Sequence, residues 1–213
     1  MSKENPVIVV IDYGAGNIFN VMKAIKYVGL AAKLTKDPSE ILAADGLVIP
    51  GVGAYKTAMD KINENQLVVP IQKAANNGTP ILGVCLGMQL LFDSSTEFGE
   101  TMGFGLIPGE VVKLPQNTGF KVPQMGWNQN SVAIENTLTQ GIKNEFTYFV
   151  HSYYVKTDTK YIAASVDYGV QVPSIVIKDN IIGAQFHPEK SGEVGLRVWQ
   201  AFANMVSDKA VNV

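Results

Sequence analysis

Short runs of apolar residues alternate with segments of helical spacing along the first half of the chain, and this alternation constrains the fold most strongly. The runs are Val7–Ile11, Leu47–Ile49 and Ile81–Val84, and a fourth, Ile181–Phe186, follows near the end of the sequence. Runs that are apolar throughout predict strands covered on both faces. Strands that alternate with helices through short connections predict an α/β fold with a mostly parallel, doubly wound sheet.

Helices are expected between these runs. Ile18, Val21, Met22, Ile25 and Val28 recur at helical spacing before Gly29, and Asp37-Pro-Ser-Glu40 offers an N-cap, a first-turn proline and a capping-box acid for a helix to about Ala44. The remaining expected helices are 54–65, Val68–Asn77, Leu86–Phe92 and Glu193–Val206.

Residues 105–182 have a different texture, with short β-rich runs separated by Gly, Pro, Asn and Asp. These runs are Val111–Leu114, Phe146–Val150, Tyr161–Val166 and Ser174–Ile177. Such a pattern predicts antiparallel hairpins added to the parallel sheet. No repeat or linker divides the 213 residues, so we expect residues 1–213 to form one domain.

Composition excludes several classes of protein. The 17 basic and 19 acidic side chains nearly balance, so the chain lacks the charge expected for binding nucleic acid or an anionic membrane. The single cysteine, Cys85, permits neither an internal disulfide nor a multi-cysteine zinc site, and the two histidines lack a cluster of further ligands. The mixed charges of residues 1–6 predict no signal peptide, and the mostly apolar stretch Ile81–Phe92 is too short to span a bilayer. We therefore expect a cytoplasmic protein without a metal.

The segment Gly83-Val-Cys85-Leu-Gly87 lies between a predicted strand and a predicted helix. A nucleophile flanked by glycines two residues away on each side is typical of a nucleophile elbow, a tight turn that exposes the nucleophile at the sheet edge. The helix beginning at Leu86 favours the thiolate form of Cys85. The alternative is a small buried cysteine without a chemical role.

The segment Phe186-His187-Pro-Glu189 follows the last predicted strand. Pro188 keeps His187 out of helical geometry, and in an extended segment Glu189 lies on the same side as His187. Glu189 can then orient the imidazole while its other nitrogen faces Cys85, as in a nucleophile–base–acid triad. A structural histidine at a strand end is the alternative for His187 considered alone.

Two glycine-containing turns follow the first two strands. Pro50-Gly-Val-Gly53 predicts a loop whose backbone N–H groups can face an oxyanion, together with the N–H of Leu86. Gly14-Ala-Gly16 suggests a dinucleotide site, but Phe19 stands where that fingerprint has its third glycine, so we expect no nucleotide cofactor.

Together, Pro50-Gly-Val-Gly53, Gly83–Gln89 and Phe186–Lys190 resemble the motifs of class I, triad-type glutamine amidotransferases. Within that family, the segments Asp12–Asn17, Met125–Asn128 and Tyr148–Tyr153 are similar to those of glutaminase subunits of imidazole glycerol phosphate synthase. The likeness extends from about Val7 to Phe202. One departure is Gln124, where the pattern has a histidine.

The resemblance implies that Cys85, His187 and Glu189 hydrolyse L-glutamine to glutamate and ammonia through a thioester, without a cofactor. It implies an oxyanion hole formed by the backbone of Leu86 and, after a peptide reorientation, of the Gly51-Val52 loop. Other residues match substrate-binding or interface positions. Those implied to bind substrate are Gln89, Glu97, His151, Ser152 and Tyr153; those implied at a subunit interface are Asn17, Asn20, Trp127, Tyr148 and Lys190.

The partner implied by the resemblance is a cyclase subunit that receives the ammonia and makes imidazole glycerol phosphate and AICAR in histidine biosynthesis. Three alternatives stay open from the sequence. The chain could serve another synthase, for example in amidino-sugar synthesis; it could be a stand-alone cysteine hydrolase or peptidase; or it could be a binding module that retains the fold without activity.

Overall fold

The structure is a computed structural model that describes residues 6–14, 16–116 and 119–211. Ala15, which belongs to the glycine-containing turn considered for a nucleotide, and residues 1–5, on which the expectation of no signal peptide partly rests, lie outside the described residues. In the described ranges, no helix combines the length and the apolar character that crossing a membrane requires.

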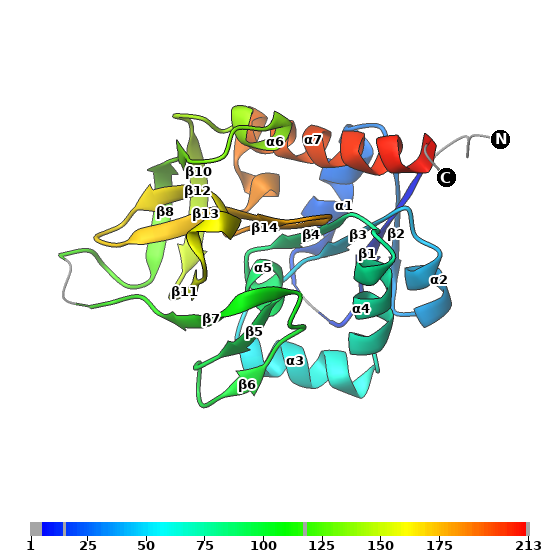
Figure 1. Cartoon of the computed structure of the whole chain (residues 1–213), viewed down its shortest axis with the longest axis horizontal. Helices are drawn as coiled ribbons and strands as arrows, with labels where there is room; N and C mark the ends of the chain where they lie inside the picture. Colours follow the sequence, from blue (N-terminus) through cyan, green and yellow to red (C-terminus); the bar gives the residue numbers. More distant parts are fainter. Residues whose placement is uncertain (1–5, 15, 117–118, 212–213) are drawn as a thin grey trace.

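An eight-stranded sheet forms the centre of the molecule (Figure 1). Its first five strands pair in parallel and its last three are antiparallel. In spatial order the strands are β2 (Ala31–Thr35), β1 (Val7–Ile11), β3 (Gly46–Ile49), β4 (Ile81–Val84), β14 (Ile181–Ala184), β13 (Gln171–Lys178), β12 (Ile162–Asp167) and β9 (Ser131–Val132). The expected parallel sheet with antiparallel additions is therefore confirmed.

Helices cover both faces of the sheet because strand side chains alternate between two hydrophobic cores. Ile8 and Val10 of β1 belong to one core, with helices α1 (Ile18–Tyr27) and α7 (Gly192–Val211). Val9 and Ile11 belong to the other. The helices of this second core are α2 (Pro38–Leu42), α3 (Tyr55–Glu64), α4 (Val68–Asn76) and α5 (Leu86–Leu90).

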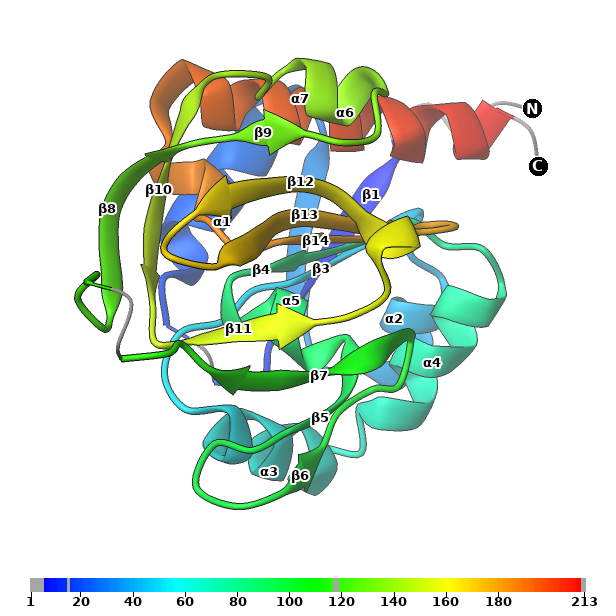
Figure 2. The ribbon, with the colours of Figure 1, turned by 60° about the vertical axis from the view of Figure 1, so that its left-hand side comes forward.

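Two smaller sheets complete the second half of the chain (Figure 2). One has the strand order β11 (Tyr153–Lys156), β7 (Ile107–Lys113), β5 (Phe92–Ser95) and β6 (Thr101–Met102). The other pairs β10 (Phe146–His151) with β8 (Gln124–Gln129). Helix α6 (Thr137–Gln140) and the 3-10 turns η1 (Thr159–Tyr161) and η2 (Pro188–Lys190) lie in the connections.

Several element boundaries differ from those expected. The helix predicted over Leu86–Phe92 ends at Leu90, and Phe92 begins a strand, because the apolar run continues from the helix into β5 without a sequence signal. The final helix is longer than predicted, extending to Val211. The capping residue Asp37 is confirmed, since its side chain accepts a hydrogen bond from the Ser39 N–H, but α2 ends at Leu42 rather than near Ala44.

Candidate active site

Cys85 lies in a tight turn between β4 and α5, as predicted. Its backbone has φ 54° and ψ −109°, a strained combination for a residue with a side chain. The two flanking glycines are required by close backbone contacts: a Cβ on Gly83 would lie 2.6 Å from the Gly87 carbonyl oxygen, and one on Gly87 would lie 1.8 Å from the Ile49 carbonyl oxygen. The turn therefore holds Cys85 at the carboxyl edge of the parallel strands.

His187 and Glu189 form a buried pair just after β14. The Nδ1 atom of His187 lies 2.8 Å from Glu189 Oε1, and both side chains are only 1% exposed. His187 is extended, with φ −98° and ψ 97°, as expected before proline. The expectation that the segment stays extended is wrong after Pro188, since Pro188 begins the 3-10 turn η2 and the Lys190 N–H donates to the His187 carbonyl. This turn, rather than a strand, brings Glu189 to the imidazole.

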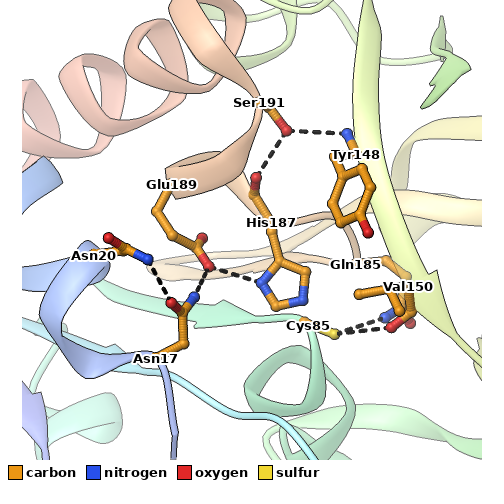
Figure 3. Close-up of polar contacts among 9 residues, drawn as sticks. All are labelled: Asn17, Asn20, Cys85, Tyr148, Val150, Gln185, His187, Glu189 and Ser191. Carbon is orange, nitrogen blue, oxygen red and sulfur yellow. Dashed lines mark hydrogen bonds and ion pairs between the residues drawn. The ribbon is translucent and has the colours of Figure 1, made fainter. Parts of the chain in front are cut away.

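Two asparagines extend this pair (Figure 3). The side-chain amide of Asn17 donates to the same Glu189 oxygen that contacts His187. Asn20 Nδ2 in turn donates to Asn17 Oδ1 at 2.7 Å, which fixes the amide so that its nitrogen faces Glu189. Sequence reasoning placed Asn17 and Asn20 only at an interface and missed this contact, which joins residues 172 positions apart.

Cys85 and His187 face one pocket of about 410 Å³. The residues that line it are Val52, Gly53, Cys85, Leu86, Gln89, Glu97, Pro123, Val150, His151, Ser152, Tyr153 and His187. The second imidazole nitrogen, Nε2, has no hydrogen-bond partner among the described residues and faces the side of the Cys85 sulfur (Figure 3). The pocket thus combines a thiol with an imidazole whose other nitrogen is already occupied by a carboxylate.

The pKa values of the two histidines are shifted in opposite directions. Burial by itself lowers the pKa of His187, but the neighbouring Cys85 sulfur and then the Glu189 carboxylate outweigh it and raise this pKa to about 9. The pKa of His151 is lowered to about 4, first by burial and also by the charge of His187. His151 Nδ1 lies 2.8 Å from the Tyr153 carbonyl, which can only accept, so this nitrogen carries the proton.

Gln185 links the thiol to Gln89, and sequence reasoning missed it. The Gln185 Nε2 donates to Cys85 Sγ at 3.9 Å, and its Oε1 accepts from Gln89 Nε2 at 3.1 Å. Gln89 Nε2 also donates to the Tyr153 carbonyl at 2.8 Å. The sequence feature that could have identified Gln185 is its position as a polar residue inside the apolar run Ile181–Phe186.

The Pro50-Gly-Val-Gly53 loop packs against the elbow. A Cβ on Gly51 would lie 2.9 Å from the Leu86 Cβ and 3.0 Å from the Gly87 nitrogen. Val52 is 42% exposed and lines the pocket. The structure therefore places the Gly51-Val52 loop beside Leu86, in contact with the turn that holds Cys85.

Two further predicted site residues, Glu97 and Ser152, line the pocket, whereas Tyr148 lies next to it through its backbone contact with His187. Glu97 Oε2 accepts from the Tyr55 N–H at 2.7 Å, and Ser152 lines the pocket between His151 and Tyr153. The Tyr148 carbonyl accepts from the His187 N–H at 3.0 Å.

Tyr148 and its neighbours connect the His187–Glu189 pair to the surface. The Tyr148 ring contacts Trp127, which is 54% exposed, at 6.0 Å between centroids. Ser191, also missed from the sequence, accepts from the Tyr148 N–H at 3.0 Å and donates to the His187 carbonyl at 2.7 Å. Lys190 is exposed. Within the described residues, no group of three or more His, Cys, Asp or Glu side chains is placed to hold a metal ion.

The chain is similar to known proteins along most of its length. The profile of the family described as Glutamine amidotransferase class-I matches residues 9–202. The chain is 50% identical over 206 residues to imidazole glycerol phosphate synthase subunit HisH of Lacticaseibacillus casei, covering 97% of this chain and 99% of the relative. It is 51% identical over 198 residues to the protein of the same name from Lactiplantibacillus plantarum, covering 93% and 95%.

Solved structures show the same fold. A crystal structure of a glutamine amidotransferase superimposes with a TM-score of 0.74 at 18% identity, covering 93% of this chain and 98% of that one. The PurLQS structure from Thermotoga maritima gives a TM-score of 0.73 at 19% identity, covering 94% and 98%. With the family profile spanning most of the sequence and two relatives half identical over nearly their whole length, the chain belongs to the class-I glutamine amidotransferases.

Proposed function

We propose that this chain is the glutaminase subunit of an imidazole glycerol phosphate synthase, with Cys85, His187 and Glu189 as its catalytic triad. The observation that carries the proposal is the buried His187–Glu189 contact of 2.8 Å, with the opposite imidazole nitrogen facing the Cys85 side of the pocket. The carboxylate holds the proton on Nδ1, so Nε2 is the nitrogen that exchanges a proton with the Cys85 sulfur.

The reaction follows from this arrangement. The Cys85 sulfur attacks the side-chain amide carbon of L-glutamine, and a C–S bond forms while the carbonyl oxygen becomes an oxyanion. His187, now protonated, gives its proton to the amide nitrogen, the C–N bond breaks and ammonia leaves. His187 then takes a proton from water, whose oxygen attacks the thioester carbon; the C–S bond breaks, glutamate is released and His187 returns the proton to the Cys85 sulfur.

The oxyanion forms where backbone N–H groups gather. We assign this role to Leu86, directly after Cys85, and to the Gly51-Val52 loop that packs against the elbow. The loop already lies beside Leu86, and its N–H faces the oxyanion after the Gly51–Val52 peptide reorients. Such a reorientation allows the partner subunit to control when glutamine is hydrolysed.

Substrate recognition is assigned to polar groups around the same pocket. Both Nε2 hydrogens of Gln89 are committed, to the Tyr153 and Gln185 oxygens, so Gln89 offers only its Oε1 as an acceptor for the substrate. Glu97 lines the pocket with a carboxylate suited to the α-ammonium group of glutamine. The backbone of His151, Ser152 and Tyr153 completes this wall.

The partner is proposed to be a cyclase subunit in a cytoplasmic heterodimer, which receives ammonia through a channel and forms imidazole glycerol phosphate and AICAR in histidine biosynthesis. The relatives named as subunits of this synthase support the assignment. Exposed apolar side chains beside the proposed triad also support a docking face: Phe19, on α1 two residues after Asn17, is 78% exposed, and Trp127 contacts Tyr148. Asn20 and Lys190 belong to the proposed face.

The test is glutamate release from L-glutamine by the purified chain, with and without the cyclase and its nucleotide ligand. We expect low activity alone and strong activation by the liganded cyclase. Glutaminase activity that is the same with and without the cyclase would indicate that the chain serves another synthase or is a stand-alone hydrolase. No glutaminase activity under either condition would contradict the proposed function.

A further inference from the structure

Tyr13 is a buried tyrosine at the carboxyl edge of the sheet, outside every site described above. It lies two residues after β1, and only 4% of its surface is exposed. Its hydroxyl donates a hydrogen bond of 2.6 Å to the carbonyl oxygen of Pro50, 37 residues away in sequence. Burying a hydroxyl costs free energy unless it is hydrogen-bonded, so the contact with Pro50 offsets the cost of burying the Tyr13 hydroxyl.

The hydrogen bond acts on the loop assigned to the oxyanion. Pro50 is the first residue of Pro50-Gly-Val-Gly53, and its carbonyl belongs to the peptide that immediately precedes Gly51. A Cβ on Gly51 would lie 2.6 Å from the Tyr13 hydroxyl as well as 2.9 Å from the Leu86 Cβ. Gly51 is therefore in close contact with both the phenol and the elbow that presents Cys85.

We propose that the Tyr13 hydroxyl is a positioning residue for glutamine hydrolysis, because it anchors the Pro50–Gly51 peptide and so places the Gly51–Val52 peptide within reach of the oxyanion. The inference rests on the proposed glutaminase function and adds a residue to that site. With the Pro50 carbonyl fixed, the Gly51–Val52 peptide can rotate without the loop moving away from Leu86. Tyr13 does not touch substrate; it acts through the loop.

The protonation state of the phenol suits this role. Burial raises the pKa of Tyr13 well above its usual range, and the neighbouring Cys85 sulfur raises it further. The hydroxyl therefore stays protonated, and able to donate to Pro50, well above neutral pH.

The test compares Tyr13→Phe with the parent chain, each in complex with the liganded cyclase. A lost oxyanion donor lowers kcat about 100- to 1,000-fold, and loss of a group that only holds the donor in place is expected to lower it about tenfold. KM for glutamine should stay within about twofold, because the interaction is made in the transition state. Tyr168→Phe is the matched control, since its hydroxyl donates to the Lys121 carbonyl at 2.8 Å, away from the pocket.

A second readout separates positioning of the oxyanion from general damage to the fold. The readout is inhibition by L-glutamate γ-semialdehyde. The Cys85 sulfur adds to its aldehyde carbon, and the aldehyde oxygen takes the thiol proton and occupies the oxyanion position. Its inhibition constant should rise about tenfold in Tyr13→Phe, in step with the loss of kcat/KM, whereas that of L-glutamate should not change. A second variant, Tyr13→Met, removes the same hydroxyl and fills the space differently, and it should show the same pattern if Tyr13→Phe does not fold.

The outcomes are distinct. Unchanged kcat in a folded Tyr13→Phe or Tyr13→Met, a loss confined to KM, or an equal loss in Tyr168→Phe would overturn the positioning role and leave the glutaminase intact. A parent chain without glutaminase activity would overturn the proposed function and the positioning role together.

Discussion

Asn17 and His187 donate to a single shared atom, the Oε1 of Glu189. Asn17 immediately precedes α1, and its side chain links the start of that helix to Glu189 of the proposed triad. Its own amide is oriented by Asn20. The proposed docking face and the proposed catalytic acid are thus joined by side-chain hydrogen bonds rather than by distant packing.

Asn17→Ala is expected to lower kcat/KM for glutamine about tenfold, since a hydrogen bond to a charged group contributes about 1.5–3 kcal/mol and part of that is recovered by rearrangement. Without Asn17, the Glu189 carboxylate is free to turn away and hold His187 less firmly. Asn20→Ala is the graded control, one hydrogen bond further away, and should cost no more than about threefold. Affinity for the cyclase must be measured for both variants, and equal kinetic losses in the two would contradict the proposed chain of contacts.

Cys85→Ala should abolish glutamine hydrolysis while leaving the fold and cyclase binding intact. Retained turnover would exclude Cys85 as the nucleophile.

Urea titration should also show Cys85→Gly to be about 1 kcal/mol more stable than Cys85→Ala, because glycine adopts the positive φ of this position without the strain that alanine retains. Equal stability of the two variants would show that the elbow is not strained.

Sequence patterns predicted the parts of the fold where local chemistry decides the structure. The buried strands β1, β3 and β4 are apolar throughout, and the glycines at 83 and 87 are required by backbone contacts within or next to the turn. Strand β2 was missed because Ala31–Thr35 is an edge strand, mostly exposed, whose mixed apolar and polar composition has no periodicity that distinguishes it from a loop.

The polar contacts of the site were harder to predict from the sequence than the buried strands and the glycine turns. His187 and Glu189 are two residues apart, so local geometry suggested their pairing. Gln89 and Gln185 are separated by 96 residues, and only the pairing of β4 with β14 brings them together. Long-range hydrogen bonds of this kind depend on strand order and register, which a single sequence does not specify.

The charge on His187 predicts a distinct pH dependence of stability. Its pKa in the folded chain, about 9, lies above the ordinary value of 6.5, so folding favours the protonated form. This contribution is fully present below about pH 6.5 and is lost as the pH rises through about 9. In Cys85→Ala one neighbour that raises this pKa is gone, so urea titrations between pH 6 and 10 should show a smaller decline than in the parent. Parallel profiles for the two proteins would contradict the coupling between Cys85 and His187.

Gln185 makes two contacts that two substitutions can separate. Gln185→Met removes the acceptor for Gln89 and the donor to Cys85, so Gln89 loses its fixed orientation and KM for glutamine should rise about tenfold. Gln185→Glu keeps an oxygen for Gln89 but places negative charge beside the sulfur. Its KM should therefore remain closer to that of the parent, while iodoacetamide should alkylate Cys85 more slowly at neutral pH because a negative neighbour disfavours the thiolate. If both variants raised KM equally and left alkylation unchanged, Gln185 would serve only to fill the core beneath the pocket.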